Sequence, residues 1–305
     1  MNHIGQAPAS SHEAGVDIVL PVYNERPEAV AATLKACLRQ THAISHIYVI
    51  DDGSAVPVEI PAGMAALSNI SLERLPYNQK NAAARNAGIA KCKSSFIACV
   101  NCEVLPASDW LATCINYLSK RPAVGVCFTR TVPEHAERLL SRWRMRFQET
   151  KFGTNTGPAP FAPGHAVLFR REAIEKAGRY KVPLGNVSED SEICERIRAA
   201  GWDTHFIAES QCISIQNNTI TEFARKELSR NGWESPKDYP LSRLILDRSK
   251  WTLTRMGYNV AKGRFSFLPV DIAVWATAVK LAASQTLAAR RSAAQSVNSA
   301  DGIEQ

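Results

Sequence analysis

Hydrophobic residues in the first half of the chain gather in short segments, separated by longer segments in which they recur every three or four positions. The short segments predict five strands: Asp17–Val22, Ile44–Ile50, Ile70–Leu75, Phe96–Val100 and Val124–Thr131. The longer segments predict helices over Glu28–Gln40, Asn81–Lys91 and Asp109–Leu118. In the first of these, Val30, Leu34, Cys37 and Leu38 form a helical stripe. Alternating strands and helices predict an α/β fold with a largely parallel sheet flanked by helices.

The pattern changes after Pro133. An arginine-rich helix is expected around Arg138 to Arg146, followed by a loop rich in glycine and proline, Gly153 to Gly164. The length and composition of this loop predict a mobile or substrate-contacting segment. Beyond residue 240 the pattern is helical, over Leu241–Met256 and Leu268–Ala289, and shows no catalytic motif. No internal repeat is visible.

Composition is that of a soluble globular protein. The chain has 305 residues, of which 45% are hydrophobic, enough to build a core. The run Met1 to Gly15 is polar and has no apolar stretch like that of a signal peptide, so a loose tail is expected. The most apolar long segment, Phe265 to Ala283, is interrupted by Asp271 and Lys280. We therefore expect a cytoplasmic protein that does not cross a membrane by itself.

The net charge of +7 is concentrated near one end. Between Arg225 and Arg291 there are 13 Lys and Arg against 5 Asp and Glu. This basic region suits an anionic membrane surface or a phosphate-bearing acceptor, and a solvated basic face is the alternative. Nucleic acid is not expected as a partner, because no basic motif is interleaved with aromatic residues.

The eight cysteines show no regular framework and no grouping with zinc spacing. Cys99 and Cys102 have the spacing of a redox motif, but they fall on or beside a predicted strand, where neighbouring side chains alternate between faces. Reduced, buried thiols are therefore expected.

Polar side chains gather where the first two predicted strands end. The first strand leads into Pro21-Val22-Tyr23-Asn24-Glu25, and the second into Asp51-Asp52-Gly53-Ser54. Ligands of open α/β sheets bind outside the carboxyl ends of such strands. A carboxylate there can accept the imide hydrogen of uracil in a charge-assisted bond. Taken alone, each motif also suits a strand-to-helix turn or an Asx turn.

Three further motifs carry candidate chemistry. Asn81-Ala-Ala-Ala-Arg85-Asn86-Ala-Gly88 combines small residues with an arginine, and Asn101-Cys102-Glu103 follows the strand ending at Val100. Ser188-Glu189-Asp190 begins a predicted helix, with Ser188 as the N-cap and the carboxylates favoured by the helix dipole. Asp190 projects from the side of Ile193 and Cys194, toward the interior. Both acids would also serve simply to start the helix.

These motifs, in this order and across roughly Val16 to Trp233, resemble the family 2 glycosyltransferases, enzymes of the GT-A fold that use nucleotide-sugars. The stretch Gly164 to Arg171 resembles the family's strand that lines the acceptor site. The resemblance implies a flexible tail over 1–15 and a GT-A domain over 16–235, with a nucleotide-binding half (16–131) and an acceptor half (132–235). A basic helical region with a loose tail, 236–305, completes the expected organisation.

The resemblance also implies a role for each motif. The residues implied in donor binding are Pro21, Tyr23, Glu25, Asp52, Arg85, Asn101 and Cys102, with Asp52 reading the base and Arg85 reaching the diphosphate or the base. Gly164 and His165 are implied in acceptor binding. Glu103 would hold Mn²⁺ or Mg²⁺, for which hard oxygen ligands are suited. Asp190, beside Glu189, would remove the proton of the acceptor hydroxyl.

Two positions depart from the family pattern. Lys80 stands where the family usually has glycine, and Asn101 stands where the family has the first aspartate of Asp-x-Asp. The first departure adds a cation near the donor or only alters a loop. The second removes a negative charge from the expected metal site.

The function implied is inverting transfer of one sugar from a nucleotide-diphosphate sugar, most often UDP-linked, to a saccharide or lipid-linked saccharide. By analogy it would serve bacterial polysaccharide or glycolipid assembly in the cytoplasm, with peripheral contact to the inner face of the plasma membrane. Two alternatives remain. The first is nucleotidyl transfer, but enzymes of that class usually have a glycine-rich, basic loop after the first strand. The segment Pro21 to Arg26 is not such a loop. A non-catalytic or metal-independent nucleotide-sugar binding module would account for Asn101.

Overall fold

The computed structural model describes residues 15–182, 189–216, 219–229 and 240–301. The chain forms two compact units. Within the described residues, the sheet unit consists of 15–134, 148–182 and 189–216, and the helical unit of 135–147, 219–229 and 240–301. The residues 1–14, most of the expected N-terminal tail, lie outside the described residues, as does Ser188.

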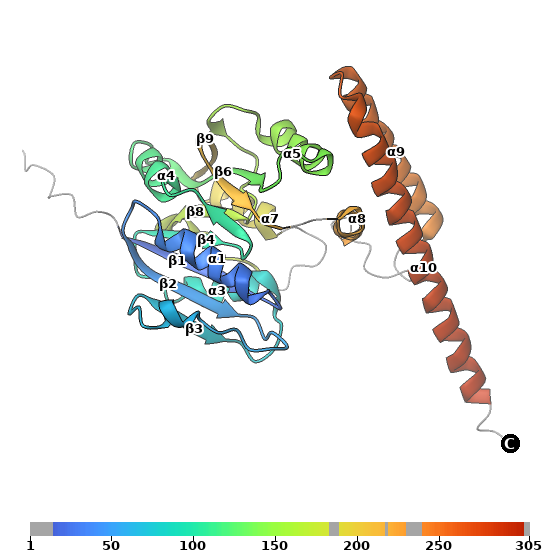
Figure 1. Ribbon diagram of the computed structural model, residues 1–305, viewed down its shortest axis with the longest axis horizontal. Coiled ribbons are helices and arrows are strands. Elements are labelled where there is room, and N and C mark those ends of the chain that lie inside the picture. The colour runs from blue at the N-terminus through green and yellow to red at the C-terminus, as the bar shows by residue number, and fades with distance from the viewer. Residues whose placement is uncertain (1–14, 183–188, 217–218, 230–239, 302–305) are drawn as a thin grey trace, which may run out of the picture. The chain divides into compact units, whose positions relative to one another are not determined.

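The sheet unit is built on one mixed sheet (Figure 1). Its strands are β1 (Val16–Val22), β2 (Ile44–Asp51), β3 (Ile70–Arg74), β4 (Phe96–Val100), β5 (Val104–Pro106), β6 (Val124–Pro133), β7 (Gly157–Pro158), β8 (Ala166–Arg170) and β9 (Asp203–Ser214). They lie in the order β3-β2-β1-β4-β8-β6-β9-β5, with β7 paired to β9. The strands β3, β2, β1 and β4 are parallel, and β8 is antiparallel to both β4 and β6.

Six helices of the described chain belong to the sheet unit: α1 (Pro27–Leu38), α2 (Ala62–Ala65), α3 (Lys80–Ile89), α4 (Trp110–Ser119), α6 (Arg171–Lys176) and α7 (Glu189–Ala199). The helix α5 (Leu139–Phe152) contains residues of both units. The sequence predicted α1, α3 and α4 to within a few residues. It did not predict β5 or β9.

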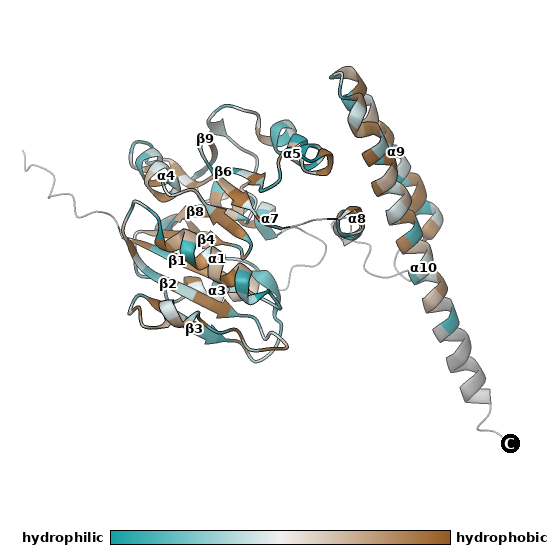
Figure 2. Ribbon diagram, in the orientation of Figure 1, coloured by the Kyte–Doolittle hydropathy of each residue, from teal (hydrophilic) through white to brown (hydrophobic). Residues whose placement is uncertain are grey.

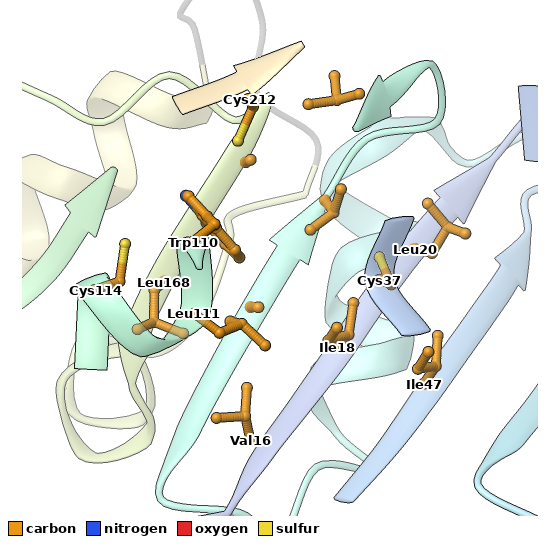
Figure 3. Close-up of a cluster of buried hydrophobic side chains, with 14 of the residues drawn as sticks. Val16, Ile18, Leu20, Cys37, Ile47, Trp110, Leu111, Cys114, Leu168 and Cys212 are labelled. Atoms are coloured by element: carbon orange, nitrogen blue, oxygen red, sulfur yellow. The ribbon is translucent and has the colours of Figure 1, made fainter. Parts of the chain in front are cut away.

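The sheet has a hydrophobic cluster on each face. On one face, alternate residues Val16, Ile18 and Leu20 of β1 pack with Leu34 of α1 and with α4, which contributes Trp110 (Figure 3). On the other face, α3 lies so close to β1 that a Cβ at Gly88 would overlap Val19. The small residues in this helix therefore allow its N-terminal turn to lie beside the ends of the parallel strands.

All eight cysteines are free and buried in the sheet unit, as the sequence predicts. Burial raises the pKa of Cys37, Cys99 and Cys212 to about 12 in each case. The thiols are therefore neutral packing groups rather than a redox pair.

The helical unit contains the first part of α5, with α8 (Ile220–Ser229), α9 (Leu241–Ala261), the short turn η1 (Phe265–Phe267) and α10 (Leu268–Asp301). Both long helices end beyond the predicted Met256 and Ala289. The unit has two small apolar clusters. One joins α8, α9 and α10 through Ala224, Leu228, Leu244, Ala278 and Ala282, and the other consists of Trp143, Phe267, Val270 and Val274.

A charged network lies inside the helical unit, around the fully buried Asp271 of α10. Its carboxylate accepts hydrogen bonds from Trp143 Nε1 at 2.9 Å, Arg146 Nη2 at 2.6 Å and Asn259 Nδ2 at 2.6 Å. Arg255 Nε lies 3.7 Å from the same carboxylate. Trp143 and Arg146 come from α5, so this network ties α5, α9 and α10 together.

Among the described residues, one helical segment, Phe265–Ala289, is long and apolar enough to cross a membrane, and a third of its most apolar window is buried. The sequence led us to expect no such segment, because Asp271 and Lys280 interrupt it. Asp271 faces the interior network rather than the outside of the unit, so it does not make the exposed side of α10 polar.

Candidate active site

The loops after β1 and β2 are joined by hydrogen bonds into one rim. The backbone N–H of Asn24 donates to Ser54 Oγ at 2.9 Å, and the N–H of Ala55 donates to Asn24 Oδ1 at 2.8 Å. Asn24 has a φ of 53°, a left-handed conformation that asparagine tolerates better than most residues. Tyr23, beside it, is 43% exposed. The first two sequence motifs are thus joined at one edge of the sheet, where Tyr23 presents an exposed aromatic ring.

The two neighbouring aspartates at the end of β2 have different surroundings. Asp51 accepts hydrogen bonds from the N–H groups of Ser54 and Val58 and pairs with Arg74 Nη1 at 2.7 Å. Burial acts to raise the pKa of Asp51, but these hydrogen bonds and the Arg74 charge outweigh it and lower that pKa. Asp51 therefore holds the turn in place.

Asp52 lies at the junction with the loop that precedes α3. Its Oδ1 accepts the N–H of Gln79 at 2.8 Å, and the residue is 3% exposed. Burial raises the pKa of Asp52 above its ordinary value, and the Gln79 bond only partly opposes this. Next to it, Gly53 has a φ of 69°, and a Cβ there would lie 2.5 Å from the backbone of Tyr77. Only glycine allows this close approach.

Arg85 of α3 connects three motifs that are far apart in the sequence. Its side chain is 1% exposed and donates to Asp190 Oδ1 at 2.8 Å and to Asn101 Oδ1 at 3.1 Å. It also donates to the carbonyl oxygen of Gly164 at 2.7 Å, and its guanidinium lies 5.2 Å from the centre of the Tyr180 ring. The sequence suggested diphosphate oxygens as its partners. The structure gives Arg85 acceptors within the protein, and contact with the diphosphate or the base of a donor stays a prediction.

Asp190 is held by two donors and remains partly exposed. Besides the Arg85 bond, its Oδ2 accepts the N–H of Gly164 at 2.8 Å, while 20% of its side chain is accessible. Gly164 has no room for a side chain, because a Cβ would overlap both Arg85 and Asp190. Glu189 is 31% exposed, and its Oε1 lies 3.5 Å from Asn81 Nδ2.

The ends of β4 and β8 place the remaining motifs beside this network. The N–H of Asn101 donates to the carbonyl oxygen of His165 at 2.8 Å, one step beyond the pair formed by Val100 and Ala166. The structure therefore brings Arg85, Asn101, Gly164 and Asp190 together at one end of the sheet. This grouping combines residues that the sequence divided between donor, acceptor and catalytic roles.

Hydrogen bonds of its backbone hold Glu103 in place, and its side chain forms an ion pair. Its φ is 65°, its N–H donates to Thr33 Oγ1 at 3.1 Å, and its carbonyl oxygen accepts the N–H of Ile215. The carboxylate, 13% exposed, lies 3.1 Å from Arg26 Nη2. Sequence reasoning missed Arg26. The signal available was a cation directly after the Tyr-Asn-Glu motif.

Cys102 lies between acidic neighbours. Burial raises the pKa of this thiol to about 12, and the negative charges of Glu25 and Glu103 contribute in the same direction. Cys102 is therefore a neutral thiol, which suits packing better than ligation of a hard cation.

Among the described residues there is no metal site built only from protein ligands, because no three His, Cys, Asp or Glu side chains come together. Glu103 offers one carboxylate, and its ion-pair partner Arg26 has a side chain that is 66% exposed and can move away. Mg²⁺ is often held by one or two carboxylates together with substrate phosphates. The donor set therefore fits a cation shared with a diphosphate.

Lys80 adopts a backbone conformation that favours glycine. Its φ is 74°, and its N–H donates to Asn78 Oδ1 at 2.9 Å. The family resemblance places glycine at this position, so the loop keeps the glycine-type conformation although the residue differs. Its exposed side chain adds a positive charge beside Asp52.

The sequence model described as "Glycosyl transferase family 2" matches residues 17–178, more than half of the chain. The chain belongs to this family. Membership makes it a transferase, and it decides between the two enzyme classes that the motifs left open, in favour of sugar transfer over nucleotidyl transfer.

Curated relatives are glycosyltransferases. A "Pre-mycofactocin glycosyltransferase" of Mycobacterium tuberculosis is 27% identical over 201 residues, covering 64% of this chain and 41% of the relative. An "N-acetylglucosaminyltransferase" of Mesorhizobium japonicum is 22% identical over 285 residues, covering 88% of this chain and 63% of the relative. The chain thus spans less than two thirds of the length of these relatives.

Two solved structures show the same fold at low identity. A mannosyltransferase from Pyrobaculum calidifontis, in complex with GDP-Man and Mn²⁺, has a TM-score of 0.57 at 18% identity, covering 98% of this chain and 83% of that one. GalNAc-T7 with UDP, GalNAc and Mn²⁺ has a TM-score of 0.51 at 15% identity, covering 83% and 59%. The family and the GT-A fold expected from the sequence are confirmed. The roles of individual residues stay predictions.

Proposed function

We propose that this protein transfers one sugar, with inversion, from a nucleotide-diphosphate sugar to a hydroxyl group of a saccharide or lipid-linked saccharide. UDP is the carrier we favour, and bacterial polysaccharide or glycolipid assembly is the setting. The observation that carries the proposal is the position of Asp190: a carboxylate oriented by two donors, yet partly exposed at the end of the sheet where the nucleotide motifs meet.

The donor nucleotide is assigned to the rim formed by the loops after β1 and β2. Asp52 accepts the imide hydrogen of the base, and the exposed ring of Tyr23 packs against it. Pro21 and Glu25 complete this side, and Asn101 and Cys102 border the sugar-diphosphate. The Asn24 bonds to the Ser54–Ala55 turn support this assignment, because they hold both loops in one arrangement before any ligand binds.

A divalent cation, Mn²⁺ or Mg²⁺, would be held by Glu103 together with the donor diphosphate. Such an ion supplies Lewis-acid stabilisation of the departing phosphate oxygens. On the protein side, Arg26 would leave Glu103 when the cation binds, and Lys80 would add charge near the diphosphate. Arg85 positions Asp190 in this scheme and borders the donor site.

Asp190 would act as the general base on the acceptor hydroxyl. Each carboxylate oxygen accepts one hydrogen bond within the protein, from Arg85 or from Gly164, and retains a second lone pair. The acceptor would lie against Gly164 and His165, with Glu189 at its edge. Direct attack by the activated hydroxyl on the anomeric carbon, opposite the leaving diphosphate, inverts the configuration. We place this reaction in the cytoplasm, at the inner face of the plasma membrane.

Calorimetric titration with UDP, GDP and dTDP, each with and without Mn²⁺, tests the proposal. We expect one nucleotide to bind in a metal-dependent way, and Glu103→Gln to remove the metal dependence without unfolding the protein. Absence of binding by all three to the folded protein would exclude the donor site.

A non-catalytic binding module is the second candidate, and one observation favours it: Asn101 brings no negative charge to the expected metal site, and its Oδ1 accepts a hydrogen bond from Arg85. Slow hydrolysis of the bound nucleotide-sugar, followed as nucleotide release, separates the two. Nucleotide binding without release under any divalent cation would select the binding module.

A further inference from the structure

The helix α9 carries its polar residues on the buried side. Its five buried residues are Leu244, Arg248, Thr252, Arg255 and Asn259, of which only the first is apolar. A helix of a water-soluble protein normally buries an apolar stripe and exposes charged residues. In α9 this order is reversed over most of its length.

Along its exposed surface α9 carries a line of apolar residues, and Arg243, Lys250 and Thr254 are exposed beside it. Leu246, Leu253 and Val260 are 55%, 66% and 48% exposed. They are spaced by seven residues, which places them in one line along the helix, and we call them the outer stripe. Arg248, Arg255 and Asn259 project from the opposite side, so the stripe and the buried polar groups face away from each other.

Three of the buried polar residues, Thr252, Arg255 and Asn259, have contacts inside the unit. Arg255 Nη2 lies 3.4 Å from Thr252 Oγ1, and its guanidinium lies 5.7 Å from the Trp143 ring. With Arg146 and Asn259 it surrounds the single carboxylate of Asp271. Charged groups paired in the interior of a helical assembly, with apolar residues outside, are the arrangement expected where the surroundings are lipid rather than water.

Aromatic and basic residues are also exposed in this part of the unit. Phe265, just beyond the end of α9, is 61% exposed. Trp251, 53% exposed, lies on the side of Arg255, whose guanidinium is 5.2 Å from its ring centre. Lys250 lies between Leu246 and Leu253, and Lys262 follows the end of the helix, both exposed. Aromatic rings and long basic side chains are favoured at the boundary between lipid headgroups and acyl chains, and the basic ones also attract anionic headgroups.

The helix α10 continues this character. Ile272 and Leu287 are 50% and 56% exposed, and the segment Phe265–Ala289 is apolar although only a third of its most apolar window is buried. Figure 2 shows hydrophobic residues along both long helices. A core helix of a soluble protein would be mostly buried at this hydropathy.

We propose that the helical unit lies in the surface of an anionic lipid bilayer, with the outer stripe of α9 inserted among the acyl chains and Lys250 and Lys262 at the headgroup phosphates. Charge complementarity selects the bilayer over a second protein as the occupant. From Arg225 to Arg291 the chain has 13 basic residues against 5 acidic ones, an excess that would repel an identical copy. The interfacial position follows because α9 exposes Lys250 and Thr254, which do not suit a helix that spans the bilayer.

Flotation of the full chain with vesicles tests this. One set contains phosphatidylcholine alone, and the other about 30% phosphatidylglycerol, chosen to attract basic residues. We expect strong binding to the anionic vesicles only, weakened by salt. Leu246→Ser with Leu253→Ser should reduce the bound fraction at least about tenfold, because two inserted leucines become polar.

The matched control is Leu67→Ser with Leu72→Ser in the sheet unit. Both leucines are 39% exposed, and the pair of changes removes the same groups from a different surface. This variant should bind vesicles like the wild type. An equal loss in both variants, or a wild type that stays in the aqueous fraction, would overturn the proposal.

Self-association is distinguished by sedimentation velocity. If the wild type is a dimer that Leu246→Ser with Leu253→Ser converts to a monomer, and neither binds vesicles, the stripe joins two copies and the lipid proposal is wrong. UDP binding is measured on the same samples. A protein that binds UDP but not vesicles would contradict the membrane contact and leave the donor site supported.

A second readout does not depend on the serine variants folding. Brominated acyl chains quench tryptophans that insert near them. Leu253→Trp puts a tryptophan at an exposed position of the outer stripe, and brominated chains should quench this variant more strongly than the wild type. Quenching no stronger than that of the wild type would place the outer stripe outside the bilayer.

Discussion

The helices α4 and α9 use the same backbone geometry and have opposite polarity. The helix α4 buries Trp110, Leu111, Cys114, Ile115 and Leu118, all apolar. The helix α9 buries one leucine and four polar or charged residues, and exposes Leu246, Leu253 and Val260 together with Arg243, Lys250 and Thr254. The first pattern is what burial of apolar surface from water produces. The second depends on the buried carboxylate of Asp271, and the proposed contact with lipid would favour its exposed apolar residues.

Buried arginines show the same contrast. Arg85 in the sheet unit is buried where the strands end, beside a carboxylate that remains partly exposed. Arg146 in the helical unit pairs with a carboxylate that is completely buried. In one unit a buried charge orients a site that a ligand can reach, and in the other it joins helices to one another. Changes at the two carboxylates should therefore have separate consequences.

Asp190→Asn should have the largest effect, and only on the sheet unit. Loss of a general base typically lowers the rate by about 10² to 10⁴-fold, and we expect this for sugar transfer or donor hydrolysis, with UDP affinity retained. Glu189→Gln is the control and should have a smaller effect. Unchanged turnover in Asp190→Asn would show that the base lies elsewhere, and altered vesicle binding would contradict the independence of the units.

Asp271→Ala should act on the helical unit alone. Removing one partner of a buried ion pair costs about 3 to 5 kcal/mol, because Arg146 would remain buried without a counter-ion. Hydrogen exchange of α9 and α10 measures the loss as reduced protection. Glu73→Gln, which removes an exposed partner of Lys91, is the control and should leave exchange unchanged. Equal protection in Asp271→Ala and the wild type would mean that the network does not stabilise the unit.

Gly164→Ala should weaken the site through packing. The new Cβ would overlap Arg85 and Asp190, and overpacking of this kind costs about 1 to 3 kcal/mol. The unfolding temperature of the sheet unit and the rate of donor hydrolysis should both fall. Gly157→Ala introduces the same methyl group where nothing lies within 4 Å, and it should behave like the wild type. Similar results for the two variants would show that Asp190 is not confined as described.

Arg26→Gln should have the smallest effect. An exposed ion pair contributes little, so removing the competitor of Glu103 should tighten Mn²⁺ binding by only about two- to fivefold. Free Mn²⁺ measured by electron paramagnetic resonance, in the presence of saturating UDP, reports this. Arg39→Gln, at the other end of α1, makes the same change of charge away from Glu103 and should have no effect. A weaker Mn²⁺ affinity in Arg26→Gln would exclude competition.

The strands that carry the nucleotide motifs could be predicted because they are short, mostly apolar segments. The strand β9 was missed for a physical reason: its exposed positions include Asp203, Glu209 and Gln211, and several of its buried positions are Thr or Ser rather than aliphatic. With polar residues on both sides, it has no hydrophobic run and no hydrophobic alternation. Its pairing with β6, β5 and β7 decides its conformation.

The candidate site was predicted as separate motifs but not as a network. Arg85 contacts Asp190, 105 positions away along the chain, and Gly164, 79 positions away, which local patterns cannot reveal. Likewise, the periodicity of α9 shows that it has two different sides but not which of them faces inward. Only the three-dimensional arrangement, with Asp271 at its centre, determines that.

The distribution of the cysteines gives the protein a built-in reporter of opening. All eight thiols belong to the sheet unit, and the helical unit has none. Alkylating reagents react with thiolates, and these thiols are both buried and, in most cases, of raised pKa, so each must first be released by an opening of the fold. The rate of alkylation at neutral pH therefore measures local opening of the sheet unit alone, and a nucleotide that slows alkylation shows that it binds, without any sugar being transferred.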